Sequence, residues 1–137
     1  MKMAFPGFLI VWLVLSLALP SSLFCAAEKK NTQAAADNPV VLILDASGSM
    51  WGQIGGKAKI VIAKEVMGEL IDGLPADLQV GLSVYGHRRD KDCADIEMVI
   101  PIGRLDRAAM KAKINAIKPK GKTPLSDAVR QAAEALR

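Results

Sequence analysis

The hydrophobic residues follow two different periods along the chain, that of a strand and that of a helix. Residues 40–44 form an aliphatic run without polar alternation, which is typical of a strand buried on both faces. Residues 79–85 alternate apolar with small or polar positions and predict a second strand. Between them, residues 57–71 have apolar side chains at helical spacing, and Gly73 and Pro75 predict the stop. The apolar positions of this helix are Ile60, Ala63, Val66, Met67, Leu70 and Ile71. Strand, helix and strand together predict a right-handed βαβ unit with parallel strands.

A third strand is predicted at residues 96–102, where every second residue from Ile96 to Ile102 is large and apolar. The connection through residues 86–94 is too short for a crossover, so we expect this strand to be antiparallel to the second. Pro101 lacks a backbone N–H donor, which places the strand at the edge of the sheet.

Two further helices are predicted after the third strand. Asp106 is a suitable N-cap for the first, which ends before Pro119. Thr123 is a suitable N-cap for the second, with Pro124 in its first turn. The expected buried positions are Met110, Ile114 and Ile117 in the first and Leu125, Ala128, Val129, Ala132 and Leu136 in the second. These patterns predict an α/β fold, a Rossmann-like, doubly wound and mostly parallel sheet with an antiparallel edge strand.

The length of 137 residues and the hydrophobic content of 51% are sufficient for one folded domain. The sequence ends at Arg137 inside a helical pattern, without a Gly, Pro or Asn to close it, so we expect the domain to be incomplete at its C-terminus. The net charge of +4 neither favours nor excludes an anionic partner.

The first 27 residues have the three parts of a secretory signal peptide: Lys2, an apolar segment at residues 8–19 and a small-residue end. We expect cleavage after Ala27 and an exported protein, periplasmic or extracellular. Lipidation at Cys25 is the alternative, although the bulky Phe24 precedes it. Residues 28–39 are polar and predict a linker to the domain.

The residues after the first strand are the strongest candidates for a functional site. Asp45, Ser47 and Ser49 offer one carboxylate and two hydroxyls, which suit a hard cation such as Mg²⁺ and do not select zinc. The carboxyl end of a strand is also where open α/β sheets bind ligands. The alternative is an ordinary turn rich in Asp, Ser and Gly, which needs no metal.

Two other motifs offer alternative chemistry. Residues 116–123 read Ala-Ile-Lys-Pro-Lys-Gly-Lys-Thr, close to a phosphate-binding loop, but Ala116 replaces the usual first Gly and a helix precedes the segment. His87 beside Ser47 or Ser49 lacks the Gly-x-Ser-x-Gly context of a hydrolase.

Charged residues outside the strand ends are expected to lie on a solvated surface. No second metal is expected near His87, because the acids there, Asp90, Asp92 and Asp95, lack the Gly and the distant Glu of a calcium loop. The most basic region contains Arg104, Arg107, Lys111, Lys113, Lys118, Lys120 and Lys122. Because it has no interleaved aromatic residues, nucleic acid is not an expected partner.

The six residues from Asp45 to Met50, behind a buried strand, resemble the metal-ion-dependent adhesion site of von Willebrand factor type A domains. The resemblance implies that Thr123, in a loop ahead of a helix, gives its hydroxyl to the same metal, in competition with its role as an N-cap. The family's third motif, an aspartate after a fourth strand, is absent because the sequence ends first. The stretch Tyr85–Glu97 looks like that of bacterial exported members, which implies that Cys93 pairs with a cysteine beyond residue 137.

The resemblance covers residues 40–137 and implies a non-enzymatic module that binds a protein partner. Asp45, Ser47, Ser49 and Thr123 would hold Mg²⁺, or Mn²⁺ or Ca²⁺, and an acidic side chain of the partner would fill the open position. The alternatives are a nucleotide hydrolase that uses Ala116 to Thr123 and a structural scaffold with a non-functional metal site.

Overall fold

The computed structural model describes residues 38–137. The predicted signal peptide at residues 1–27 and nearly all of the predicted linker at residues 28–39 lie outside this part of the chain. Within residues 38–137 no helix is both long enough and apolar enough to cross a membrane.

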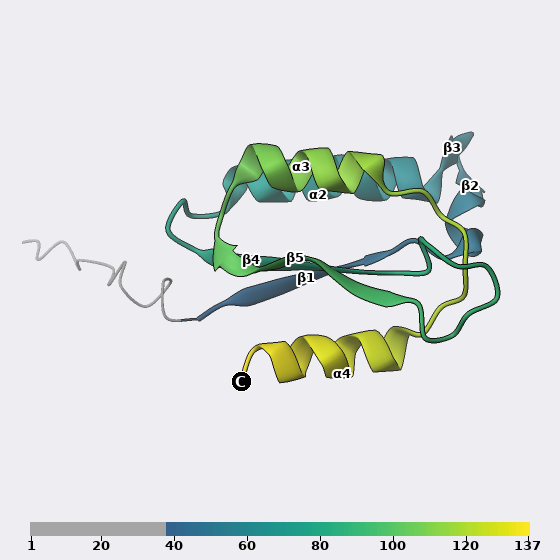
Figure 1. The fold of residues 1–137 in the computed structure, drawn as a ribbon. Helices are drawn as coiled ribbons and strands as arrows, with labels where there is room; N and C mark the ends of the chain where they lie inside the picture. The colour runs from purple at the N-terminus through teal and green to yellow at the C-terminus, as the bar shows by residue number, and fades with distance from the viewer. Residues whose placement is uncertain (1–37) are drawn as a thin grey trace, which may run out of the picture.

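A three-stranded sheet in the order β1-β4-β5 forms the centre of the fold (Figure 1). β1 (Val40–Asp45) runs parallel to β4 (Gln79–Tyr85), and β4 runs antiparallel to β5 (Ile96–Arg104). The parallel pair requires a crossover, which α2 (Lys59–Gly73) supplies, whereas β5 follows β4 after a short loop. The three predicted strands and the antiparallel edge strand are therefore confirmed.

Helices cover both faces of the sheet. α2 and α3 (Arg107–Ala116) lie together on one face, and α4 (Leu125–Ala135) lies on the other (Figure 1). This arrangement confirms the predicted α/β, doubly wound fold class. Asp106 accepts a hydrogen bond from the Ala109 amide at 3.0 Å, as predicted for the N-cap of α3.

The hydrophobic core lies between β4 and the helix pair α2 and α3. Val80, Leu82 and Val84 alternate along β4 and are at most 1% exposed, as the period of two requires for one face of a strand. The two helices contribute four residues that are at most 2% exposed: Ile60, Ile71, Met110 and Ile114. The opposite face of β4 has the small residues Gly81 and Ser83.

The prediction that β1 is buried on both faces is wrong. Only Leu44 of this strand is buried, and Val40 is 36% exposed. β1 occupies an edge of the three-stranded sheet, with β4 as its only neighbour among the described strands. An edge strand receives contacts from one side, so an apolar run alone does not establish burial.

Some predicted buried helix positions are exposed. In α2, Val66 is 58% and Leu70 is 46% exposed, because at about 100° per residue they point some 120° and 80° away from Ile60. In α4, only the small residues Ala128 and Ala132 are buried. The large residues of the predicted α4 stripe are about half exposed: Leu125, Val129 and Leu136.

Residues 48–58 form a 3₁₀ turn followed by a short hairpin. η1 (Gly48–Trp51) is a 3₁₀ turn, and β2 (Gln53–Ile54) pairs antiparallel with β3 (Lys57–Ala58). Gly55 and Gly56 both have positive φ angles, 58° and 80°, which only a glycine pair adopts easily in a tight hairpin. The Gly-Gly pair between the two short strands is therefore the sequence signal of this hairpin.

Candidate metal site at the ends of the parallel strands

The parallel pairing of β1 and β4 brings their carboxyl ends side by side. Asp45 lies opposite Tyr85 in the register, and the Ala46 amide donates a 2.9 Å hydrogen bond to the Tyr85 carbonyl. The two strands therefore deliver their following loops to one end of the sheet, where ligands bind in open α/β folds.

The loop after β1 brings together three side chains whose oxygen atoms could bind a metal: Asp45, Ser47 and Ser49. The Ser47 amide donates to Asp45 Oδ1 at 2.7 Å, and the hydroxyls of Ser47 and Ser49 lie 2.9 Å apart. Ser47 is the N-cap residue of η1, but its side chain makes no cap hydrogen bond. Ser47 is 1% exposed and Ser49 is exposed, so the donors extend from the protein interior toward solvent.

The spacing of these hydroxyls fits a small hard cation. Neighbouring ligands of an octahedral ion with bonds of 2.0–2.1 Å stand about 3 Å apart, close to the 2.9 Å between the two serine oxygens. Within residues 38–137 no three His, Cys, Asp or Glu side chains form a group that could hold a metal. A cation at this end of the sheet would therefore depend on hydroxyl ligands beside a single carboxylate.

A second loop crosses the first and positions Thr123. This segment, residues 118–123, is called the lysine loop below. Gly121 forms an isolated parallel bridge with Ser47, and its carbonyl accepts a 2.9 Å hydrogen bond from the Gly48 amide. The Lys120 amide donates to the Ala46 and Gly86 carbonyls, both at 3.0 Å. These bonds bring Thr123, two residues beyond Gly121, to the same end of the sheet as Asp45.

The prediction that Thr123 caps the last helix is wrong. The N-cap of α4 is Pro124, and no side-chain hydrogen bond caps this helix. Thr123 is exposed. Its hydroxyl is therefore not committed to a helix end, which removes the competition between capping and metal binding.

Tyr85 supports Asp45 from the neighbouring strand, a role that the periodicity of its own strand does not indicate. Its side chain is buried, and its hydroxyl forms a side-chain hydrogen bond with Asp45. Burial, followed by the negative charge of Asp45 and the hydrogen bond to Asp45, together raise the pKa of the phenol to about 12. Tyr85 therefore remains a neutral donor at neutral pH. Aligning the carboxyl ends of the two predicted parallel strands would have indicated this neighbour.

A third loop, residues 86–95, flanks the site and is organised by Asp95. Asp95 is fully buried, and its carboxylate accepts hydrogen bonds from the Arg88 amide at 2.8 Å and the Arg89 amide at 3.0 Å. The Arg88 guanidinium adds a 2.8 Å bond from Nε. The prediction of a simple surface loop is therefore wrong for Asp95, because charge-rich composition does not reveal which carboxylate turns inward.

The pKa of Asp95 reflects two opposing causes. Burial of the carboxylate favours its neutral form, but the hydrogen bonds from the Arg89 and Arg88 amides and the Arg88 guanidinium favour the charged form and prevail. The result lowers the pKa of Asp95 to about 2. The carboxylate therefore stays ionised at neutral pH and holds the turn between β4 and β5.

The structure offers little support for the alternative chemistries. The segment 116–123 begins at the last residue of α3 and so follows a helix rather than a strand. Its Lys120 and Gly121 amides donate to backbone carbonyls instead of facing an open phosphate cradle. His87 lies 3.0 Å from a Glu97 oxygen through Nε2 and makes no hydrogen bond to Ser47 or Ser49. The nucleotide-binding and triad hypotheses therefore lack the geometry that they require.

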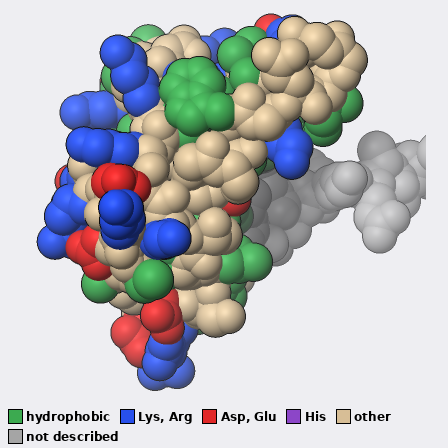
Figure 2. Space-filling model, turned by 90° about the vertical axis from the view of Figure 1, so that its right-hand side faces the viewer, with side chains coloured by type: hydrophobic (Ala, Val, Ile, Leu, Met, Phe, Trp, Pro, Cys, Tyr) green, Lys and Arg blue, Asp and Glu red, His purple; other side chains and the backbone are tan. Residues whose placement is uncertain are grey.

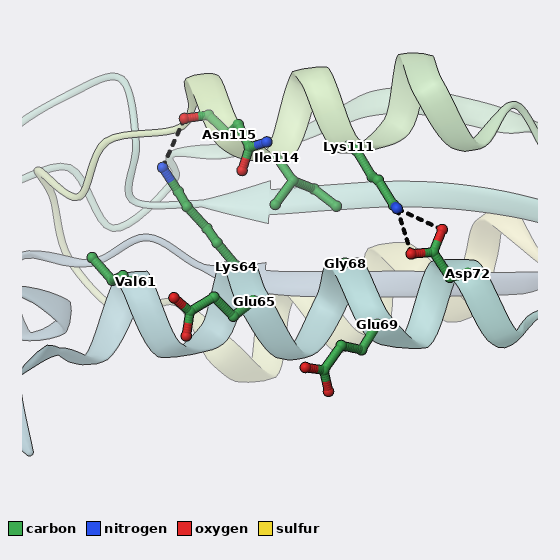
Figure 3. Close-up of a pocket in the computed structure, with 9 residues that line it drawn as sticks. All are labelled: Val61, Lys64, Glu65, Gly68, Glu69, Asp72, Lys111, Ile114 and Asn115. Atoms are coloured by element: carbon green, nitrogen blue, oxygen red, sulfur yellow. Dashed lines mark hydrogen bonds and ion pairs between the residues drawn. The ribbon is translucent and has the colours of Figure 1, made fainter.

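A separate groove of about 510 Å³ lies between α2 and α3 (Figure 3). Lys64 spans it and donates to the carbonyls of Asn115 at 2.8 Å and Ile117 at 2.6 Å. Lys111 pairs with Asp72 across the same groove. These contacts join the two helices, so the polar groups of the groove are used largely in helix packing.

Cys93 is exposed and free within residues 38–137. Its expected pairing with a cysteine beyond residue 137 stays a prediction.

Comparisons with known proteins agree with the fold. Residues 40–137 match the von Willebrand factor type A domain. Two similar proteins of Bacillus subtilis (strain 168) are the uncharacterized proteins YwmC, 32% identical over 139 residues, and YwmD, 31% identical over 136 residues. These alignments cover 96% and 94% of this chain but 60% and 57% of the relatives, so the chain spans about 60% of their length.

A solved structure shows the same fold. The crystal structure of the conserved hypothetical protein BatB from Bacteroides thetaiotaomicron matches with a TM-score of 0.58 and 24% identity. The match covers 72% of this chain and 46% of that protein.

Gly86 is expected to be essential for bringing the three loops together. Its φ is 70°, and a Cβ atom would lie 2.5 Å from the Lys122 carbonyl oxygen. Replacing Gly86 with Ala should lower the free energy of unfolding by about 2–4 kcal/mol in urea titrations, because strain and a backbone clash coincide. Gly68→Ala in α2 is the matched control, since nothing lies within 4 Å of its added Cβ. It should raise stability by about 0.5–1 kcal/mol through helix propensity, and equal effects of both changes would contradict the account.

Acid should weaken the fold through Asp95. The folded state binds this proton more weakly than the unfolded chain, whose Asp pKa is about 4, so the stabilisation is complete above that pKa. It is lost as the pH falls toward the folded pKa of about 2, at a total cost of about 2 kcal/mol. Urea titrations between neutral pH and pH 2 should show this loss, and Asp95→Asn should flatten it while lowering stability at pH 7. Asp90, in the same loop, is exposed and forms no ion pair within the described part of the chain, so Asp90→Asn should leave the profile unchanged.

Proposed function

Because the chain belongs to the von Willebrand factor type A domain family, whose members are commonly protein-interaction modules, we propose that it is a non-enzymatic binding module. It recognises a protein partner through a divalent cation held by Asp45, Ser47, Ser49 and Thr123. Mg²⁺ is the favoured ion, with Mn²⁺ and Ca²⁺ as the other hard cations that oxygen ligands accept. We further propose that residues 1–27 direct the protein to the periplasm or the extracellular space.

The observation that carries this proposal is the pair of serine hydroxyls 2.9 Å apart beside the Asp45 carboxylate. Two serines that merely capped a turn would each bond to backbone amides. Here the Ser47 side chain makes no capping hydrogen bond to η1. Its hydroxyl instead forms a hydrogen bond with the hydroxyl of Ser49. Such adjacent hydroxyls suit joint coordination of one ion.

The charge of the site explains how a partner would be recognised. One carboxylate offsets half of the charge of a divalent ion, and the hydroxyls of Ser47, Ser49 and Thr123 add none. The bound cation would therefore retain positive charge and open positions. A Glu or Asp side chain of the partner supplies the missing negative charge, so the affinity for the partner depends on the metal.

A structural scaffold with a non-functional metal site is the alternative. The two functions differ in one measurable property, which is the affinity of the site for a divalent ion. Within the family, divalent metal binding is common, and this favours the metal-dependent function.

Calorimetric titration with Mg²⁺ and Mn²⁺ tests the metal site. The wild-type protein should bind one ion and gain thermal stability, because the ion binds the folded state alone. Asp45→Ala should abolish binding because it removes the only charged ligand of the set. Thr123→Ala should weaken binding by about tenfold through loss of one neutral ligand.

Ser126→Ala is the matched control, because Ser126 is an exposed hydroxyl residue in α4 outside the proposed ligand set. It should leave the metal affinity unchanged. A wild-type protein that shows neither heat nor thermal stabilisation would contradict the metal-dependent function and favour the scaffold.

A further inference from the structure

The lysine loop presents three positive charges beside the candidate metal site. Lys118, Lys120 and Lys122 are all exposed, and none of them forms an ion pair within residues 38–137. The cations that do pair with carboxylates are Lys57, Arg88, Arg89, Lys111 and Arg130. Three unpaired like charges within five residues repel one another, so their position favours a role in binding an anionic partner.

The hydrogen bonds of the lysine loop fix where these charges lie. Lys120 and Lys122 adjoin Gly121, the residue that pairs with Ser47, and the Lys120 amide bonds to the Ala46 carbonyl at 3.0 Å. Figure 2 views the molecule from the end of the sheet at which β1 terminates. Lys and Arg side chains gather along one side of this face, with fewer acidic side chains among them. This face of the molecule is therefore mainly basic on that side.

An apolar surface adjoins the same loop. Trp51 is 55% exposed, yet its indole Nε1 donates a 3.0 Å hydrogen bond to the carbonyl of Pro119, between Lys118 and Lys120. An exposed indole that is fixed in this way is a suitable anchor for a partner, because little side-chain freedom is lost on binding.

A shallow groove continues this apolar surface to the metal site. Its volume is about 380 Å³, and Asp45 lies at its lining together with Met50 and the 61% exposed Ile54. The other lining residues are mostly apolar side chains of α2 and β1. The exposed Ile54 and the candidate ligand Asp45 therefore line the same groove.

We propose, as an extension of the metal-dependent function above, that the partner presents an acidic stretch with a large apolar residue rather than a lone carboxylate. One carboxylate of the stretch completes the metal site. The following acidic residues lie against Lys118, Lys120 and Lys122, and the apolar side chain packs beside Trp51 and Ile54. Coulombic attraction of this kind raises the association rate and is weakened by salt.

Three synthetic fluorescent peptides test this partner chemistry by anisotropy in Mg²⁺ buffer. The first is a Gly-Ser peptide with a single Glu, the second contains several Glu residues, and the third adds a Leu to the second. The affinity should rise by about tenfold from the first to the second, with a steep dependence on salt, and rise again for the third. Equal affinity for all three peptides would overturn the proposal.

Variants assign the preference to the lysine loop. Lys120→Gln combined with Lys122→Gln should remove the preference for several Glu residues, while binding of the single-Glu peptide and of Mg²⁺ persists. Arg104→Gln combined with Arg137→Gln removes the same charge from exposed residues that are remote from the site and form no ion pair within residues 38–137, and it should change nothing. If both double variants lost the same affinity for the peptide with several Glu residues, the effect would be one of net charge alone, which would contradict the proposal.

Chelation separates this proposal from the metal-dependent function. Peptide binding that is lost in EDTA and shows the acidic preference supports both. Binding of the acidic peptides that persists in EDTA but is lost in the lysine variant supports the basic surface and contradicts the metal site. Tight binding to phosphatidylglycerol vesicles without any preference among the peptides would overturn the acidic partner in favour of an anionic membrane.

Discussion

The hydrogen bonds between the lysine loop and the ends of β1 and β4 are the constraint on which the candidate site depends. The Lys120 amide is shared between the Ala46 and Gly86 carbonyls, and the Gly121 amide adds a 2.8 Å bond to Gly86. These bonds bring together segments that are more than thirty residues apart in the chain. They also require glycine, because a Cβ on Gly121 would lie 2.3 Å from the Arg89 carbonyl oxygen. The ligands proposed for the cation are close in space because these backbone hydrogen bonds hold the lysine loop against the ends of β1 and β4.

Electrostatics around the site is divided between the interior and the rim. Inside, Tyr85 and the Ser47 amide donate to the Asp45 carboxylate, and buried Asp95 neutralises Arg88 while it shapes the neighbouring loop. At the rim, Lys120 and Lys122 lack acidic partners within the described chain. Buried charges are therefore satisfied by the fold, whereas the rim leaves positive charge available to an incoming anion.

The sequence predicted the elements better than their surroundings. The βαβ unit, the antiparallel edge strand and the Asp106 cap follow from local spacing and capping chemistry, and they are confirmed. Burial was harder to predict, because it depends on which neighbours surround an element. The apolar run of β1 lies at a sheet edge, and α4 packs through two alanines rather than its larger side chains.

The same limit applies to the site. Asp45, Ser47 and Ser49 are close in sequence, so their shared chemistry could be inferred without a structure, although their metal-binding role stays a prediction. Tyr85 and the inward turn of Asp95 depend on strand register and loop path, which single-residue patterns do not encode. For Thr123 the sequence permits both a helix cap and a metal ligand; Pro124 occupies the cap position and leaves the threonine hydroxyl exposed, while its metal-binding role stays a prediction.

Paramagnetic broadening by Mn²⁺ in amide NMR spectra tests the central claim most directly, because the effect falls off steeply with distance from the ion. Substoichiometric Mn²⁺ should broaden the amide signals of residues 45–49 and 121–123, and excess Mg²⁺ should restore them. The signals of Arg104 and Arg137, remote from the site, should remain sharp. Two results would contradict a metal site formed by Asp45, Ser47, Ser49 and Thr123. One is broadening centred on residues 90–92 of the loop between β4 and β5, and the other is broadening that does not saturate as Mn²⁺ is added.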